Sequence, residues 1–294
     1  MKRSTERILT THTGSLPREA EIAELLLARE RGEPFDDARL DTASRKAIGI
    51  CIDRQLETGL DVVGDGEQSK PSYVTYVIDR LSGFEGERPH TYPVRLDSAD
   101  FPEWARQRAP RGLAALRVPT CDGPIAWKDF DAVRREIEQM KTAVAGKTIH
   151  EAFLTAASPG VIASMLPNAY YGSDEEYLQA LASVMRDEYE AIVEAGFLLQ
   201  IDCPDLAMSR HSTFSQLDLD GFKRVAAMHV EVLNEAVANI DPERMRMHVC
   251  WGNYEGPHNH DVPLHEIAPI VLAARPAGLC IEGSNPRHAH EWKT

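Results

Sequence analysis

The sequence predicts an α/β protein of the (β/α)8, or TIM, barrel type. Short apolar segments that are typical of strands alternate along the chain with longer segments in which apolar residues recur at every third or fourth position. Each short segment ends in a polar loop, and the chain of 294 residues is long enough for one large barrel. Such alternation is typical of βα units that wind into a parallel sheet.

Six segments are predicted to be strands. They are residues 8–13, 61–64, 152–157, 197–201, 245–249 and 278–281. A closed barrel needs eight strands in about 250 residues, and the last predicted strand lies close to residue 294. We therefore expect a barrel that lacks its last two βα units. The alternative is an open α/β sheet, which needs only six strands.

Helices are predicted between and around these strands. They are residues 18–31, 38–58, 130–145, 174–195, 219–238 and 264–274. In the fourth helix the apolar residues form one stripe, which predicts packing against the core. Asp174 is the expected N-cap of this helix, and Gly196 is expected to end it.

Residues 72–128 interrupt the alternation with many Pro, Gly and Arg residues. We interpret this segment as an insertion after the second strand, within a single domain that spans residues 1–294, and expect a hairpin around residues 121–123. The segment is the most basic stretch of the chain, but acidic residues are interleaved among its arginines. It is therefore expected to be a solvated loop. The arginines are Arg88, Arg95, Arg106, Arg108, Arg111 and Arg117.

Composition and charge exclude several classes of protein. Apolar residues make up 43% and charged residues 27% of the chain, which argues against a disordered protein. A net charge of −14 disfavours nucleic-acid and membrane partners. The sequence has no apolar run near the roughly twenty residues that cross a bilayer and no signal segment, so a cytoplasmic location is expected. The odd number of cysteines, 5, without CxxC pairs, favours thiolate or metal chemistry over disulfides.

Polar side chains follow the predicted strands at the points where the strands end. They are Glu67, Asp202, His248, Cys250 and Glu282. Barrel enzymes assemble their active sites at the carboxyl ends of the strands. We therefore expect these side chains to meet at one edge of the sheet.

His248 and Cys250 are separated by one residue, so on a strand both side chains point to the same side, about 6 to 7 Å apart. Imidazole and thiolate are a donor set that suits zinc, and Glu282 could supply a third donor. Taken alone, the pair is a weak signal, because ordinary strand packing explains it as well. A zinc ion bound to a substrate thiol would lower the pKa of that thiol and hold it as thiolate.

Five ordered motifs together resemble the catalytic barrel of the cobalamin-independent methionine synthase family. They are TTHTGSLPR at residues 10–18, GDGE at 64–67, QIDCP at 200–204, MHVC at 247–250 and IE at 281–282. The resemblance runs from residue 8 to about residue 290. It implies that His248, Cys250 and Glu282 bind Zn2+, and that Gly14, Ser15, Glu67 and Asp202 contact the amino-acid part of a homocysteine-like substrate.

The resemblance also has gaps. The family's fourth zinc ligand is a cysteine beyond Glu282, and no cysteine follows Cys280 here. The family's catalytic acid is a late histidine, and no residue of this chain is assigned to it. Truncation would expose strand edges, so a homo-oligomer is one expected consequence, and an inactive fragment with a residual zinc site is another.

The chain resembles the single-barrel branch of the family, which contains two kinds of enzyme. Methionine synthases methylate the thiol of homocysteine to a thioether, with a folate or a methylated corrinoid protein as methyl donor. Epoxyalkane:coenzyme M transferases alkylate a thiol that carries a sulfonate. Carboxylates such as Glu67 and Asp202 favour a substrate with an ammonium group, while a sulfonate would prefer arginine or lysine. We therefore favour methyl transfer.

Several of these residues also have a purely structural interpretation. Asp202 and Ser15 could each cap a helix, since Asp and Ser are favoured N-cap residues. Cys280 is expected in the core, below Glu282 on the same strand face. His258 and His260 could bind metal or substrate, but exposed loop histidines more often bind neither.

Overall fold

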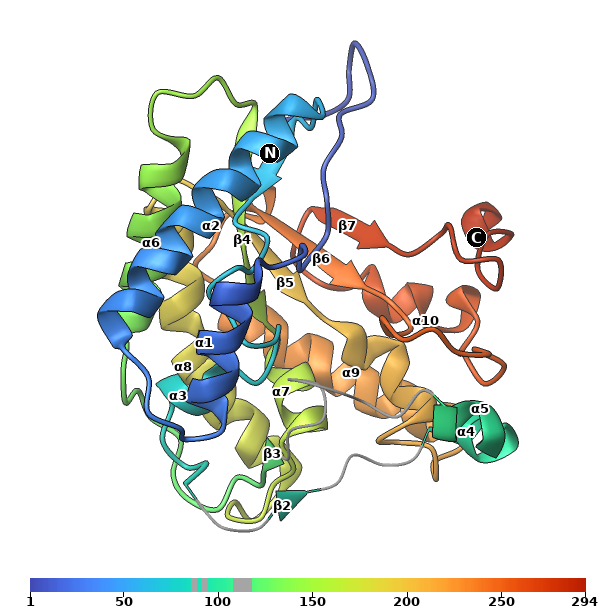
Figure 1. Cartoon of the computed structure of the whole chain (residues 1–294). Coiled ribbons are helices and arrows are strands. Elements are labelled where there is room, and N and C mark those ends of the chain that lie inside the picture. The colour runs from blue at the N-terminus through green and yellow to red at the C-terminus, as the bar shows by residue number, and fades with distance from the viewer. Residues whose placement is uncertain (86–88, 91–94, 108–117) are drawn as a thin grey trace.

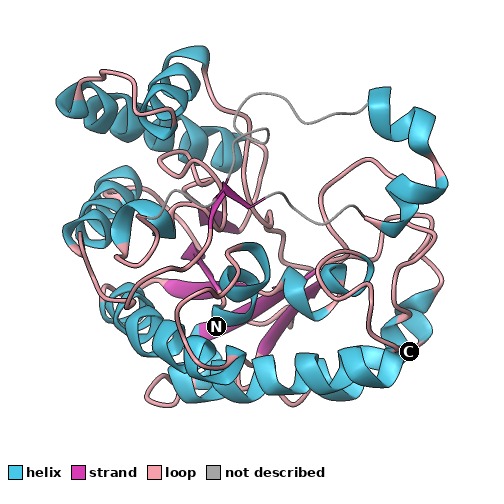
Figure 2. Cartoon of the chain, turned by 90° about the horizontal axis from the view of Figure 1, so that it is seen from below, coloured by secondary structure: helices cyan, strands magenta, loops and turns pink. Residues whose placement is uncertain are grey.

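The computed structural model describes residues 1–85, 89–90, 95–107 and 118–294, and its centre is a parallel five-stranded sheet with helices around it (Figures 1 and 2). Each strand pairs in parallel with the next in the order β1-β4-β5-β6-β7. The predicted α/β class with a parallel sheet is confirmed. The strands are β1 (Val62–Gly64), β4 (Glu151–Ala157), β5 (Leu198–Asp202), β6 (Met245–Val249) and β7 (Gly278–Ile281).

The sheet is curled, as in part of a barrel. Thr11 pairs with Val62 on the edge of β1 that faces away from β4, so Thr11 and β6 lie at opposite sides of the strand order. In a flat sheet they would be roughly 19 Å apart, because neighbouring strands are spaced by about 4.8 Å. Yet Nη1 of Arg246, on β6, donates to the hydroxyl of Thr11 at 3.1 Å. The strands therefore wrap around a shared interior.

The predicted strand at residues 8–13 is wrong as a regular strand. Thr11 forms only an isolated bridge with Val62, and the carbonyl of Thr10 accepts the backbone N–H groups of Asp61 and Val62, each at 3.0 Å. The Asp61 carboxylate in turn accepts the Thr10 N–H at 2.8 Å. The segment thus lies beside β1, as its β-branched pattern predicts. Two backbone bonds to the Thr10 carbonyl and the Asp61 carboxylate hold it there, and it does not form a regular ladder.

Alternating strand residues point to two different environments. The outward side chains join the main hydrophobic core and are buried against the surrounding helices; they include Leu154, Leu199, Ile201, Met247 and Val249. The inward side chains are mostly polar; they include Thr155, Gln200, Asp202, Arg246 and His248. The strands thus build a core on one face and carry polar chemistry on the other.

All six predicted helices are present within a few residues of their expected bounds. They are α1 (Ala20–Glu30), α2 (Asp37–Glu57), α6 (Asp131–Val144), α8 (Asp174–Glu194), α9 (Leu219–Ala236) and α10 (Leu264–Val271). Shorter helical segments are α3 (Val77–Arg80), α4 (Leu96–Asp100), α5 (Pro102–Gln107), α7 (Pro159–Met165), η2 (Pro204–Leu206), η3 (Met208–His211), η4 (Pro242–Arg244) and η5 (Glu291–Lys293). None of the described helices is both long and apolar enough to cross a membrane.

The ends of α8 correct one expectation and confirm another. Ser173, and not Asp174, is the N-cap: its hydroxyl accepts the N–H of Glu176 at 3.1 Å. Asp174 lies in the first turn, where its charge complements the helix dipole. Gly196 follows the C-cap with φ of +98°, the left-handed conformation that glycine adopts without steric cost.

The segment between β1 and β4 contains α3, α4, α5 and the antiparallel pair β2 (Pro89–His90) and β3 (Val118–Pro119). Residues 86–88, 91–94 and 108–117, with Arg88, Arg108, Arg111 and Arg117, lie outside the described part. The hairpin expected at 121–123 is wrong, because Cys121 pairs in parallel with Asn168. The interpretation of residues 72–128 as an insertion in a single domain stays a prediction.

Candidate active site

The residues predicted to carry chemistry gather at the carboxyl ends of the central strands. In the sheet register Asp202 lies beside His248, and Val249 lies beside Ile281, directly before Cys250 and Glu282. Glu67 lies in the turn that follows β1. Parallel strands present their carboxyl ends on one edge, so this edge holds all five predicted positions.

Glu67 is held in an unusual conformation. It is 1% exposed and has a φ of +54°, which non-glycine residues rarely adopt. Its Oε2 accepts from the Ser15 hydroxyl at 2.5 Å, and its Oε1 accepts from the Thr155 hydroxyl at 3.2 Å. Residues in such conformations cluster at functional sites, where surrounding contacts maintain the strain.

Ser15 and Gly14 lie next to Glu67, as the site prediction required, but not at a helix start. Helix α1 begins at Ala20 with Glu19 in the N-cap position, so the N-capping interpretation of Ser15 is wrong. A methyl group added to Gly14 would lie 3.5 Å from Oε1 of Glu67. The Ser15 hydroxyl points toward the Glu67 carboxylate, to which it donates.

Asp202 is buried beside a second carboxylate. Burial and, after it, the negative charge of Glu67 raise the pKa of Asp202 to about 8. Its Oδ1 accepts from Nε2 of Gln200 at 2.8 Å, while Cys203 is the N-cap of η2, so the helix-cap interpretation of Asp202 is wrong. The charges of Lys70 and Arg246 only partly offset this rise in pKa, so the two close carboxylates favour binding of a cation such as an ammonium group.

We expect Asp202→Asn to stabilise the protein at pH 8 by on the order of 1 kcal/mol or more, while weakening cation binding. The folded-state pKa of Asp202 lies above its ordinary value of 3.8, so its contribution to stability is complete below that value and is lost as pH rises toward 8. Urea unfolding at pH 5 and pH 8 measures this. A variant that is less stable than the wild type at pH 8 would contradict the prediction.

The pKa values of His248, on β6, and of Cys250, directly after it, are both shifted from their ordinary values. Burial and then the charge of Arg246 lower the pKa of His248 to about 4, so the imidazole is neutral, and its Nδ1 is buried without a hydrogen-bond partner in the described structure. Burial, opposed by a bond to the backbone of Gly252 and assisted by the charge of Glu282, raises the pKa of Cys250 to about 12. A neutral imidazole with an unpartnered nitrogen suits a metal ligand, whereas Cys250 would release its proton on metal binding.

Glu282 follows β7 and is half-buried, close enough to Cys250 for their charges to interact. Among the described residues no three His, Cys, Asp or Glu side chains are gathered in the geometry of a metal site. The donor types and their strand register fit zinc, and the ligand assignment stays a prediction. The sequence predicts Cys280 in the core, but it is half-buried, because β7 is the last strand of the sheet.

The sequence predicts that His258 is an exposed loop residue, and this prediction is wrong. It is 5% exposed, and its Nδ1 lies 2.8 Å from Oδ2 of Asp261. Nδ1 of His211 and Nε2 of His288 contact the same carboxylate, at 3.0 and 2.7 Å. We call these four residues the Asp261 cluster. His260 is more open and bonds to Asp100 at 2.6 Å.

The sequence predicts no role for the inward-facing residues that lie two positions before the strand ends. Thr155, Gln200 and Arg246 each lie two residues before a strand-end position and share its face. All three bond to the candidate site or to the segment that carries Ser15. Strand alternation could have identified them, since polar residues at inward positions need partners.

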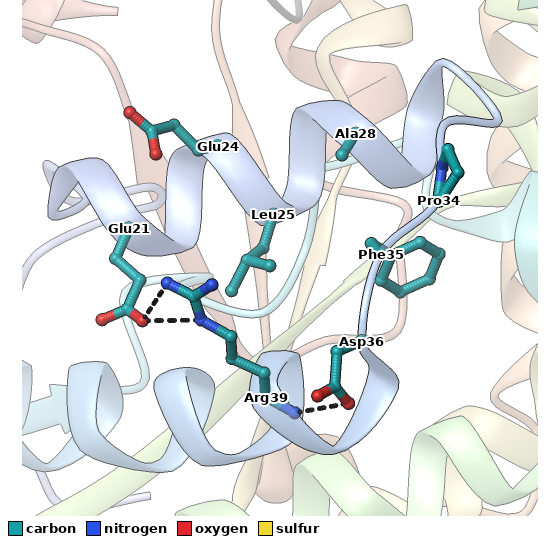
Figure 3. A pocket seen from close by; sticks show the side chains of 8 residues that line it. All are labelled: Glu21, Glu24, Leu25, Ala28, Pro34, Phe35, Asp36 and Arg39. Atoms are coloured by element: carbon teal, nitrogen blue, oxygen red, sulfur yellow. Dashed lines mark hydrogen bonds and ion pairs between the residues drawn. The ribbon is translucent and has the colours of Figure 1, made fainter.

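A surface pocket of about 470 Å³ lies between α1 and the start of α2 (Figure 3). Arg39 pairs there with Glu21 at 2.9 Å, and Asp36 caps α2. None of the candidate site residues lines it. The pocket is therefore distinct from the strand-end site.

The fold and these residues define an α/β protein with a curled parallel sheet and a polar site at the carboxyl ends of its strands. Residues 8–91 match the family described as "Cobalamin-independent synthase, Catalytic domain". The chain is 25% identical over 261 residues to the methionine synthase of Saccharolobus solfataricus. The aligned region covers 88% of this chain and 68% of that protein. Both comparisons support the cobalamin-independent methionine synthase family for this chain.

Two further comparisons agree with this. Over 246 residues the chain is 25% identical to the methionine synthase of Sulfurisphaera tokodaii. The aligned region covers 83% of this chain and 62% of that protein. A B12-independent methionine synthase structure from a Shewanella species, in complex with selenomethionine, matches with a TM-score of 0.60 at 22% identity. That match covers 83% of this chain and 61% of the other, and it shows the fold alone.

Proposed function

We propose that this chain is a zinc-dependent methyltransferase that methylates the thiol of homocysteine to the thioether of methionine. One observation carries the proposal: the buried carboxylate pair Glu67 and Asp202 lies at the same strand ends as the donors His248 and Cys250. The first pair suits the substrate's amino group, and the second suits a metal that binds its sulfur. The names of the family and of the relatives point to the same reaction.

The carboxylate pair would bind the substrate ammonium. A bound cation between Glu67 and Asp202 would favour the ionised form of Asp202, which burial and the charge of Glu67 disfavour in the free protein. Ser15 and Thr155 hold Glu67 in position by donating to its two oxygens. Arg18 fixes the turn by donating to the carbonyls of Glu67 and Lys70, each at 2.7 Å.

His248, Cys250 and Glu282 would hold the metal. When bound, zinc would lower the pKa of the substrate thiol, so that no protein base is needed at neutral pH. His248 is already neutral, while Cys250 would give up a proton. The methyl donor would be a folate or a methylated corrinoid protein, and no residue is assigned as the catalytic acid.

The bonds of the nearby arginines disfavour coenzyme M as the thiol. Nε, Nη1 and Nη2 of Arg246 donate to Gln200, Thr11 and the carbonyl of His12. Arg18 donates to backbone carbonyls. A sulfonate would have to displace these bonds, whereas an ammonium meets carboxylates directly.

Zinc content measured together with thiol binding tests the proposal. We expect about one zinc per wild-type chain, at least a tenfold lower zinc affinity in Cys250→Ser, and proton release on adding homocysteine but not coenzyme M. Cys121→Ser is the matched control, because Cys121 is buried away from the strand ends beside Gly123. Unchanged zinc binding in Cys250→Ser, or a preference for coenzyme M, would refute the proposal.

A further inference from the structure

The side-chain amide of Gln200 connects the two halves of the candidate site. Its Nε2 donates to Oδ1 of Asp202 at 2.8 Å and to the carbonyl of Thr13 at 2.5 Å. Thr13 directly precedes Gly14 and Ser15, and Ser15 donates to Glu67. The amide therefore ties Asp202, at the end of β5, to the segment that holds Glu67.

Arg246 fixes which way this amide points. Nε of Arg246 donates to Oε1 of Gln200 at 2.9 Å. A guanidinium can only donate and the Thr13 carbonyl can only accept, so reversing the amide would lose both of these bonds. Arg246 is itself held by Thr11 and His12 and lies 3.8 Å above the ring of Phe153.

We propose that Gln200 is a positioning residue for the substrate's amino group, holding Asp202 and the Thr13 to Ser15 segment so that the ammonium fits between Asp202 and Glu67. The inference rests on the proposed function, since it assumes an amino-acid thiol as substrate. Gln200 itself need not touch the substrate, because both of its Nε2 hydrogens and its Oε1 already have protein partners.

Loss of the Gln200 amide is expected mainly to weaken binding of the substrate's amino group. Without Gln200 the Asp202 carboxylate loses its donor and can rotate, and the Thr13 carbonyl loses the bond that joins it to β5. The proposed metal donors are His248, on the neighbouring strand β6, and Cys250, directly after it, and in the described part of the chain neither forms a hydrogen bond with this amide. The effect should therefore depend on whether the ligand carries an ammonium group.

Gln200→Leu tests this with two thiols that differ in one group. Homocysteine carries the ammonium, and 4-mercaptobutanoate keeps the thiol and carboxylate without it. By titration calorimetry on the full chain supplied with zinc, we expect the variant to bind homocysteine about tenfold more weakly than the wild type does. Binding of 4-mercaptobutanoate should be unchanged. Equal losses for both thiols, or no loss for either, would overturn the inference.

Two controls separate positioning from general damage. Gln139→Leu makes the same change at a buried glutamine that bonds to Asp41 between α6 and α2, and it should leave both affinities unchanged. Arg246→Lys keeps the charge but loses the three-way donation, and it should weaken homocysteine selectively and less than Gln200→Leu does. If Gln200→Leu fails to fold, the selective loss of homocysteine binding in Arg246→Lys tests the inference in its place. A wild type that binds both thiols equally would refute the proposed function itself.

Discussion

Replacing Arg80 with alanine is expected to lower the free energy of unfolding by about 3 to 5 kcal/mol. The Arg80 side chain is 8% exposed and lies between two buried carboxylates: Nη2 bonds to Glu136, and Nη1 lies 3.3 Å from Oε1 of Glu188. Its guanidinium also lies 4.5 Å above the ring of Tyr76. Among the described residues, removing it leaves Lys70, 3.7 Å from Glu136, as the remaining cationic partner of the two buried carboxylates.

The protonation states show why the loss is large. Burial would raise the pKa of Glu136, but Arg80 and Lys70 outweigh burial and hold that pKa below its ordinary value. Burial dominates for Glu188, whose pKa is raised. Without Arg80, Glu136 would keep only the more distant Lys70 and Glu188 would lose its guanidinium, so the ionised forms of both carboxylates would be disfavoured in the folded state at neutral pH.

Urea unfolding at pH 7 measures the effect, with Arg134→Ala as the control. Arg134 pairs with Asp131 on the surface of α6, where both side chains are about two-thirds exposed, at 67% and 68%. Exposed pairs of this kind contribute roughly 0.2 to 1 kcal/mol. If Arg80→Ala cost no more than Arg134→Ala, the buried ion cluster would not be a source of stability.

Local patterns predicted the elements of this fold well, and the reason is physical. Apolar periodicity reports which face of a segment is buried, so α8 and the strands β4 to β7 were found within a few residues. The cap of α8 was placed one residue late because Ser173 and Asp174 are both good capping residues. The segment at 8–13 has strand-like residues, yet it lies at the sheet edge and forms only one bridge.

The parts of the site that sequence did not predict depend on contacts between distant residues. Arg246 meets Thr11 across the curled sheet, 235 positions apart in sequence, and no local pattern encodes that encounter. The conformation of Glu67 likewise depends on bonds from Ser15 and Thr155. The strand-end positions were predictable because the parallel sheet alone brings them to one edge.

The Asp261 cluster gives the second large effect: Asp261→Asn should cost about 3 kcal/mol at pH 5 to 6 and less at higher pH. Both ring nitrogens of His288 lie 2.7 Å from carboxylate oxygens, those of Asp261 and Glu291, and both of His258 face Asp261 and the carbonyl of Tyr254. Rings with an acceptor at each nitrogen are stabilised as imidazolium ions. The variant removes their shared negative partner.

The pH dependence follows from opposite shifts within the cluster. Burial opposes the charges of His258 and His288, but the bonds to Asp261 outweigh it and hold both pKa values above 6.5. Their contribution is therefore complete below pH 6.5 and is lost as pH rises through the raised values. Burial likewise opposes the charge of Asp261, but its histidine partners hold its pKa below 3.8, so its contribution is present above that pH and is lost in stronger acid.

Urea unfolding at pH 5.5 and pH 9 therefore separates this account from simple loss of packing. The difference between wild type and Asp261→Asn should shrink from pH 5.5 to pH 9, because pH then rises above the ordinary pKa of histidine and the stabilisation of the protonated His258 and His288 is progressively lost. Asp100→Asn is the matched control, because Asp100 pairs with His260 at the surface and should change stability little. A loss for Asp261→Asn that is equal at both pH values would show that the cluster acts through shape and not through charge.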